Sequence, residues 1–139
     1  VAMLDSTEVE GRKISELVKD GKIKQNRLDE IVERTKKGGA EIVKYLEKGS
    51  AFYAPATSGV EMAESFLKDQ KKQLPCAVYL NGEYGYKDIY AGVPVIIGSK
   101  GVEKIVEINL TTQEKKNFDI SINAVKELSN AAKKIDNTL

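Results

Sequence analysis

The sequence predicts an α+β domain, in which helices and an antiparallel sheet occupy separate stretches of the chain. Apolar residues recur every three or four positions in the first half, whereas they alternate in short stretches after Leu74. Helical periodicity returns after Thr111 and continues to about Ile135. Helices followed by a strand meander and one more helix are typical of the α+β class.

The first half of the chain predicts a short helix and a long one. The short helix covers Ile14–Lys19 and stops near Gly21. The long helix stops near Gly49, and one of its faces contains Leu28, Ile31, Val32, Thr35, Gly39, Ile42, Val43 and Leu46. On the opposite face, Glu30–Arg34 and Glu33–Lys37 have the spacing of i,i+4 ion pairs.

Two adjacent glycines, Gly38 and Gly39, interrupt the long helix. Each glycine in a helix interior costs about 1 kcal/mol relative to alanine. The pair predicts either a kink or a tolerated defect in the helix, or else the close approach of another backbone, which a missing Cβ permits. The sequence favours neither alternative.

A third helix is expected to begin at Pro55 and to run to about Gln70. Its apolar residues form two stripes, Val60–Ala63–Leu67 and Met62–Phe66. So wide an apolar surface favours burial on two sides in a core, with a subunit contact on one side as the alternative. Glu61 and Glu64 are one turn apart, and we interpret them as solvated residues rather than as an acid–base pair.

Three strands joined by short turns predict an antiparallel meander. The strands are expected at Cys76–Leu80, Ile89–Ile97 and Val102–Leu110. The turns fall at Asn81-Gly82, a strong hairpin dipeptide, and at Gly98–Gly101. Gly92 and Pro94 mark a bulge or an edge position in the second strand.

Thr111 and Glu114 form a capping box that starts the last helix. The residues expected to face the core are Phe118, Ile122, Val125, Leu128, Ala132 and Ile135.

The composition excludes several kinds of site. The chain has 139 residues, with 22 Lys and Arg against 21 Asp and Glu, so no basic surface for nucleic acid or an anionic membrane is expected. It has no histidine and one cysteine, which excludes a zinc site and a histidine-activated nucleophile within it. Neither a dinucleotide-binding glycine motif nor a P-loop is present. We therefore expect no catalytic residue and no metal ligand in this chain.

The composition also bears on where the protein is located in the cell. No apolar run is long enough to span a bilayer, and no signal peptide is recognisable. Cys76 cannot form an internal disulfide, which is typical of a reducing compartment, and a cytoplasmic protein is expected. We interpret Cys76 as a small buried apolar residue rather than as a reactive thiol.

The segment Gly49–Ser58 is the most unusual one, because it places aromatic residues among small ones between two long helices. Small residues at a helix N-terminus let a ligand approach the backbone, and the positive end of the helix dipole favours an anion. The alternative interpretation is a tight helix–helix corner.

Several long motifs together resemble the lactate/malate dehydrogenase family, and most closely its bacterial lactate-dehydrogenase-like malate dehydrogenases. They are ERTKKGGAEIV, GSAFYAPATSGVEMAESFLKD, LPCAVYLNGEYG and YAGVPVIIG, followed in matching order by GVEKIVEINL, the capping box and the last helix. The resemblance implies that residues 1–139 are a single substrate-binding C-terminal domain of antiparallel strands packed with long helices. The family's NAD-binding Rossmann domain is expected to be absent from the chain.

In that family a histidine–aspartate pair moves a proton while hydride passes between the nicotinamide of NAD and the hydroxy acid, and arginines hold the carboxylates. These residues lie upstream of the stretch that Val1 begins, in agreement with the missing histidine. The resemblance therefore implies one half of an NAD-dependent enzyme of the tricarboxylic acid cycle that interconverts malate and oxaloacetate. The isolated chain is expected to be inactive.

The resemblance places Ser50 and Ala51 at the dicarboxylate substrate and Pro55 near the nicotinamide ring of the cofactor. Lactate dehydrogenases usually have threonine in place of Ala51, and the smaller side chain leaves room for a second carboxylate. The resemblance also implies a homo-oligomer, with the helix from Pro55 to Gln70 as the place to look for a contact. The alternatives are a lactate dehydrogenase fragment and a non-catalytic binding or oligomerisation module, which the charged stretch 2–13 favours.

Overall fold

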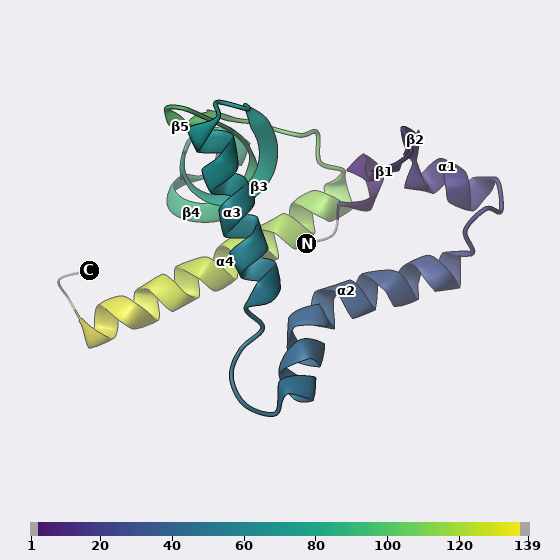
Figure 1. The fold of residues 1–139 in the computed structure, drawn as a ribbon, viewed down its shortest axis with the longest axis horizontal. Coiled ribbons are helices and arrows are strands. Elements are labelled where there is room, and N and C mark those ends of the chain that lie inside the picture. The colour runs from purple at the N-terminus through teal and green to yellow at the C-terminus, as the bar shows by residue number, and fades with distance from the viewer. Residues whose placement is uncertain (1–2, 137–139) are drawn as a thin grey trace. The chain divides into compact units, whose positions relative to one another are not determined.

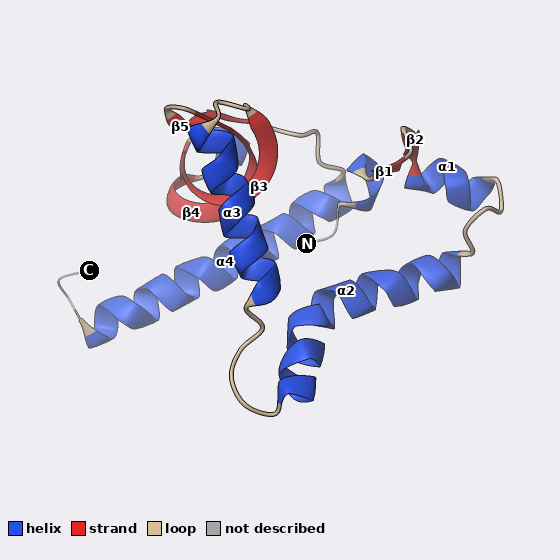
Figure 2. Ribbon diagram, in the orientation of Figure 1, coloured by secondary structure: helices blue, strands red, loops and turns tan. Residues whose placement is uncertain are grey.

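The computed structural model describes residues 3–136. The chain divides into two compact units, with the division between Pro55 and Ala56. Figure 1 labels the helices and strands, and Figure 2 shows that strands occupy separate stretches from the long helices. The α+β class is therefore confirmed. That residues 1–139 act as one substrate-binding domain stays a prediction.

The first unit begins with small elements that the sequence analysis missed. A 3-10 turn, η1 (Leu4–Ser6), precedes two short antiparallel strands, β1 (Glu8–Val9) and β2 (Arg12–Lys13). Glu10 and Gly11 connect these strands with φ of 51° and 76°. Positive φ at both turn residues is the type I′ geometry of tight hairpins. The charged opening stretch is therefore folded into a hairpin.

Two helices complete this unit, α1 (Ile14–Lys19) with the predicted bounds and α2 (Gln25–Leu46). Within α2 the buried side chain is Leu28, whereas Ile31, Ile42 and Leu46 are 45%, 44% and 44% exposed. The apolar face predicted for this helix is thus uncovered over most of its length in the described structure.

The glycine pair lies in the second half of α2, a helix that changes direction along its length in Figures 1 and 2. Outside the helix's own backbone, no described atom lies within 4 Å of a Cβ built on Gly38 or Gly39. No close approach therefore explains the glycines in this chain, and the kink is the alternative that the structure supports. A glycine pair is one of the recognised causes of a helix kink.

The ion pairs of α2 differ from those predicted. Glu30 pairs with Arg27 at 3.0 Å and Glu33 with Lys36 at 2.7 Å, both at i,i+3 spacing. The predicted i,i+4 pairs of these two glutamates were wrong. They were assigned from spacing alone, and long side chains choose among several partners one turn away.

The second unit contains a three-stranded antiparallel sheet in the order β3-β4-β5, which confirms the meander. Its strands are β3 (Lys72–Asn81), β4 (Lys87–Gly98) and β5 (Gly101–Ile105). Every second side chain of β4 is buried, and the core consists of Cys76, Leu80, Ile89, Ala91, Val93, Val95, Ile97, Phe118 and Ile122. One face of the sheet is thus buried, as alternation requires.

The β3–β4 connection is longer than the predicted two-residue turn. Asn81 pairs with Lys87, and the residues between them include the 3-10 turn η2 (Glu83–Gly85). Of the two alternatives predicted for Gly92 and Pro94, the bulge was wrong, because no register shift lies there. The edge position is confirmed locally, because β5 pairs only with Val95–Gly98 and β3 is the ladder partner of Gly92 and Pro94. β4 is the central strand, and its register shifts lie opposite Leu80/Asn81 and at Ile96/Ile97.

Tyr84 explains how a central strand tolerates proline and why β5 is short. Val106 N–H donates to the Pro94 carbonyl at 2.8 Å, but Pro94 has no N–H to return. The Tyr84 hydroxyl donates to the Val106 carbonyl at 2.7 Å instead and accepts from Ile108 N–H at 3.1 Å. A side chain thus replaces the next strand pair. The predicted strand to Leu110 was wrong beyond Ile105, because backbone partners there come from this tyrosine.

Helix α3 (Tyr53–Leu67) starts two residues before the predicted Pro55 and ends before Gln70. Its buried residue is Ser65, which is 0% exposed, whereas Val60 and Leu67 are 66% and 78% exposed. The favoured two-sided core helix was therefore wrong. The subunit contact that was the alternative stays a prediction.

Helix α4 (Thr112–Ile135) begins with the predicted capping box. Glu114 N–H donates to the Thr111 hydroxyl at 3.3 Å, and Thr111 N–H donates to the Glu114 carboxylate at 3.0 Å. Phe118 and Ile122 are buried as predicted, but Leu128 is 72% exposed, and Val125 and Ile135 are exposed too. The core face is therefore confirmed for the first half of α4 and wrong for the second.

Candidate functional site

The corner between α2 and α3 carries the predicted substrate residues. Helix α2 ends where Glu47 has a φ of 59° and Gly49 a φ of 94°. Such left-handed backbone reverses the chain after a helix and favours glycine. Ser50 and Ala51 follow directly, with Ser50 exposed and Ala51 half-buried. The corner thus carries two small side chains directly after a reversal of the chain.

The start of α3 lies two residues beyond Ala51. Pro55 is exposed in the first turn, where its missing N–H breaks no helical bond. The first turn contains no acidic residue, so no side-chain carboxylate there neutralises the positive end of this 15-residue helix. The structure therefore places Ser50, Ala51 and Pro55 on one short stretch beside a helix N-terminus.

An aromatic pair in the same corner was missed as a functional feature. The rings of Phe52 and Tyr53 lie 4.6 Å apart between centroids, and the residues are 56% and 80% exposed. Exposed large apolar side chains that touch one another are typical of surfaces that another molecule covers. Their position among small residues was the available signal.

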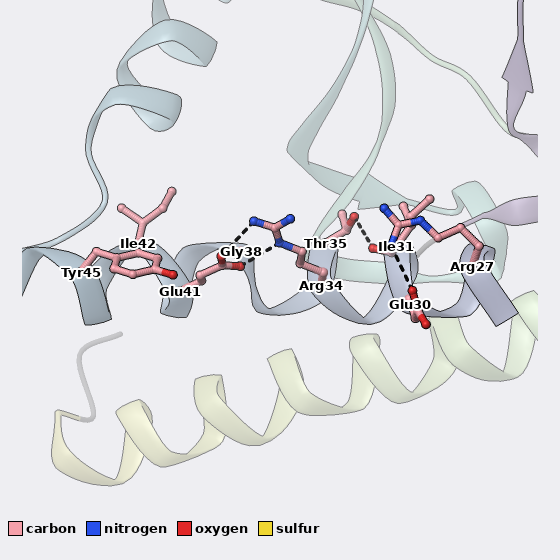
Figure 3. Close-up of a pocket in the computed structure, with 9 residues that line it drawn as sticks. All are labelled: Arg27, Glu30, Ile31, Arg34, Thr35, Gly38, Glu41, Ile42 and Tyr45. Atoms are coloured by element: carbon pink, nitrogen blue, oxygen red, sulfur yellow. Dashed lines mark hydrogen bonds and ion pairs between the residues drawn. The ribbon is translucent and has the colours of Figure 1, made fainter.

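A groove of about 620 Å³ lies along α2 and contains none of the predicted site residues (Figure 3). It is lined by Arg27, Glu30, Ile31, Arg34, Thr35, Gly38, Glu41, Ile42 and Tyr45. Its arginines are both paired, and the hydrogen bond from Arg34 lowers the pKa of Glu41 below its ordinary value. The groove thus carries compensated charge rather than a cationic anion site.

The other titratable candidates are structural, as predicted. Cys76 is buried, and burial raises the pKa of its thiol. Glu61 pairs with Lys72 at 3.4 Å. Glu64 accepts a hydrogen bond from Lys68, which lowers the pKa of Glu64.

Within residues 3–136, no three or more Asp, Glu or Cys side chains gather as metal ligands would. No helix among these residues is long and apolar enough to cross a membrane.

Together, the antiparallel meander, the capped last helix and the long helices before the sheet define an α+β domain. The sequence profile of lactate/malate dehydrogenase, alpha/beta C-terminal domain, matches residues 1–138. The chain therefore belongs to the lactate/malate dehydrogenase family, as its alpha/beta C-terminal domain.

Two proteins of similar sequence are malate dehydrogenases. The chain is 67% identical over 130 residues to malate dehydrogenase of Pelagibacter ubique, covering 94% of this chain and 41% of that protein. It is 55% identical over 139 residues to malate dehydrogenase of Roseobacter denitrificans, covering 100% of this chain and 43% of that protein. The chain thus spans less than half the length of these relatives.

Solved structures agree in fold. Cryptosporidium parvum malate dehydrogenase superposes with a TM-score of 0.90 at 42% identity, covering 94% of this chain and 42% of that one. Eimeria maxima lactate dehydrogenase with NADH and oxamate superposes with a TM-score of 0.93 at 41% identity, covering 97% of this chain and 42% of that one. The fold is therefore common to malate and lactate dehydrogenases and does not separate them.

Proposed function

We propose that this chain is the substrate-binding half of an NAD-dependent malate dehydrogenase that interconverts malate and oxaloacetate. The observation that carries the proposal is the identity of 67% to a malate dehydrogenase over 94% of the chain. The absence of histidine supports a division of labour, because the proton carrier must then lie outside these residues.

The corner after α2 is the part of the chain that would meet the dicarboxylate. Ser50 offers a hydroxyl that donates to a carboxylate, and Ala51 leaves space beside it. The start of α3 adds backbone N–H groups and the positive end of a helix dipole. These groups bind and orient the substrate, whereas the proton is moved by residues outside this chain.

The proposal gives NAD one contact among the described residues, at Pro55. The exposed ring of Pro55 offers a rigid apolar surface for the nicotinamide, but no glycine-rich loop is present to hold the phosphates. NAD bound beside Pro55 would supply the hydride acceptor for the oxidation of malate. Pro55 would pack against the ring and exclude water from that side.

Two further properties belong to the proposal. A cytoplasmic location agrees with the lone buried Cys76, which forms no disulfide in the structure. A homo-oligomer agrees with the exposed apolar side chains of α3, among them Val60 and Phe66. Size-exclusion chromatography with light scattering tests the oligomer, and a monomer at all concentrations would contradict it for this chain.

A chimaera tests the function. The matching C-terminal part of the Pelagibacter ubique malate dehydrogenase is replaced by this chain, and NADH formation from malate is followed by absorbance. We expect malate-dependent NADH from the chimaera and none from this chain alone. A folded chimaera that binds NAD but does not oxidise malate would refute the proposal, and so would activity of the isolated chain.

Lactate is the second candidate substrate, because lactate dehydrogenases superpose as well as malate dehydrogenases. Ala51 favours the dicarboxylate, since a threonine there fills space next to the substrate. In the chimaera, Ala51→Thr should lower kcat/KM for malate at least tenfold, about 1.4 kcal/mol. Ser58→Ala on the surface of α3 is the matched control, and preference for lactate in the unaltered chimaera would reverse the assignment.

A further inference from the structure

The bent helix α2 carries an ion pair that spans its glycine pair. Arg34 donates twice to Glu41, from Nε at 3.1 Å and from an Nη at 3.0 Å. Gly38 and Gly39 lie between these two residues. Figure 3 shows the two side chains reaching toward one another along the groove. A bidentate arginine–carboxylate contact has a defined geometry that a single lysine contact lacks.

The groove beside this ion pair runs along one face of α2. Its lining residues all come from α2 and lie both before and after the glycines. These residues recur at helical spacing along one face of α2, and Gly38 adds no side chain in the middle of that face. The Arg34–Glu41 ion pair therefore joins the parts of α2 before and after the glycines.

Packing does not determine the shape of α2 in this chain. Leu28 is its buried side chain in the described structure and belongs to the first half. In the second half, Ile42, Val43 and Leu46 are at least 40% exposed. Glycine restricts the backbone least of all residues, so the bend angle depends on contacts made across it.

We propose that Gly38 and Gly39 are a hinge in α2 and that the Arg34–Glu41 ion pair is the clasp that holds the hinge bent. The clasp sets the position of the predicted substrate residues, because only Glu47–Gly49 separate the end of α2 from Ser50. Both partners are solvent-accessible, with side-chain exposures of 78% and 32%, so ionic strength acts on the clasp. The hinge does not depend on which substrate the corner binds.

Distance measurement between spin labels tests the hinge in the full chain. Labels are attached in a Cys76→Ala background at Asn26→Cys and Lys44→Cys, which are exposed positions. These positions are five turns apart, so their Cα atoms would lie about 27 Å apart on one face of a straight helix. We expect a shorter mean distance at low salt, and a broader, longer distribution in molar salt.

The variants separate the clasp from a general loss of charge. Arg34→Gln should broaden the distribution toward the straight-helix distance and abolish its salt dependence. Arg27→Gln is the matched control, because its ion pair with Glu30 lies within the first half of α2. The charge swap Arg34→Glu with Glu41→Arg should restore the short distance. Gly38→Ala with Gly39→Ala should give one narrow distance near about 27 Å.

Several outcomes would overturn the inference. Identical spin-label distance distributions for the unaltered chain and Arg34→Gln would show that the ion pair does not stabilise the bent form of α2. An equal shift of the distance in Arg27→Gln would show that the effect comes from net charge rather than from the Arg34–Glu41 ion pair. An unchanged distance in the double alanine variant would show that Gly38 and Gly39 are not a hinge. Helix content from circular dichroism verifies that each variant is folded. None of these results bears on malate oxidation, so the hinge and the proposed function fail independently.

Discussion

At the scale of single residues, two hydroxyl groups complete the backbone hydrogen bonding of the sheet. Tyr84 supplies the bonds at Val106 and Ile108 that Pro94 and the end of β5 leave open. Ser65, which is fully buried, donates to the Ile97 carbonyl at 2.7 Å and accepts from Lys72 N–H at 3.2 Å. Buried backbone groups without partners are costly, so each hydroxyl has a stabilising role.

Tyr84→Phe should lower the free energy of unfolding by about 1–3 kcal/mol, because it leaves the Val106 carbonyl and the Ile108 N–H without this partner. The loss should be smaller in a Pro94→Ala background, since alanine returns the N–H that the Val106 carbonyl otherwise lacks. Urea unfolding of the four proteins of this double-mutant cycle measures the coupling. Equal losses in both backgrounds would contradict the idea that the Tyr84 hydroxyl replaces the N–H that Pro94 lacks.

Ser65→Ala should also lower the free energy of unfolding by about 1–3 kcal/mol, because two buried backbone groups lose their partner. The exposed Ser121, which donates to the Asn117 carbonyl at 3.4 Å, provides the control Ser121→Ala. That change should alter stability by no more than about 0.5 kcal/mol. Equal effects in urea unfolding would show that the buried hydroxyl contributes nothing beyond helix propensity.

At the scale of elements, α4 is fastened to the β3–β4 connection by a charged cluster. The Tyr86 hydroxyl donates to Asp119, and Lys115 donates to both. The Lys115 ammonium also lies 4.5 Å from the centroid of the Tyr86 ring. The rings of Tyr86 and Phe118 are 5.8 Å apart, so the cluster borders the core contact of the same helix. It therefore couples the charge of α4 to the packing of the sheet.

Asp119→Asn should reduce stability at pH 7, and the deficit should be smaller at pH 3. The hydrogen bond from Lys115, followed by that from Tyr86, lowers the pKa of Asp119 in the folded state. A lowered pKa contributes stability above the ordinary range near pH 4, and that stability is lost as the pH falls through the folded value. Urea midpoints at both pH values measure this. Glu127→Gln on the same helix is the charge-matched control, and a pH-independent deficit in Asp119→Asn would contradict the assignment.

At the scale of the whole molecule, burial is unequal between the two units. Ile14 and Leu28 are the buried apolar side chains described in the first unit, whereas the rest of the core belongs to the second. Segments with few buried apolar contacts open at lower free energy than core strands. Helix α2 and the corner after it therefore belong to the less protected part of the chain.

Hydrogen exchange should show this inequality directly. Amides of α2 should exchange at least tenfold faster than those of β4 in the same chain, a difference of about 1.4 kcal/mol in opening free energy. Mass spectrometry of peptides covering residues 25–46 and 87–98 measures both rates. Equal protection would mean that the first unit opens only with the second, which would contradict the difference in burial.

Local sequence patterns determined much of this protein without reference to its tertiary structure. The bounds of α1, the Thr111–Glu114 capping box and the order of the meander depend on neighbouring residues, so they could be predicted. The site residues Ser50, Ala51 and Pro55 came from family resemblance, because no local chemistry distinguishes them from a tight corner. Their roles stay predictions.

Tertiary structure decided which apolar faces are covered and where strand pairing ends. Leu28 and Leu128 both lie on periodic apolar faces in the sequence, yet one is 5% and the other 72% exposed. The end of β5 at Ile105 depends on Tyr84, which lies more than twenty positions earlier. Periodicity identifies a face that burial would favour, but the partner that covers it comes from distant residues. Only the folded chain brings those residues together.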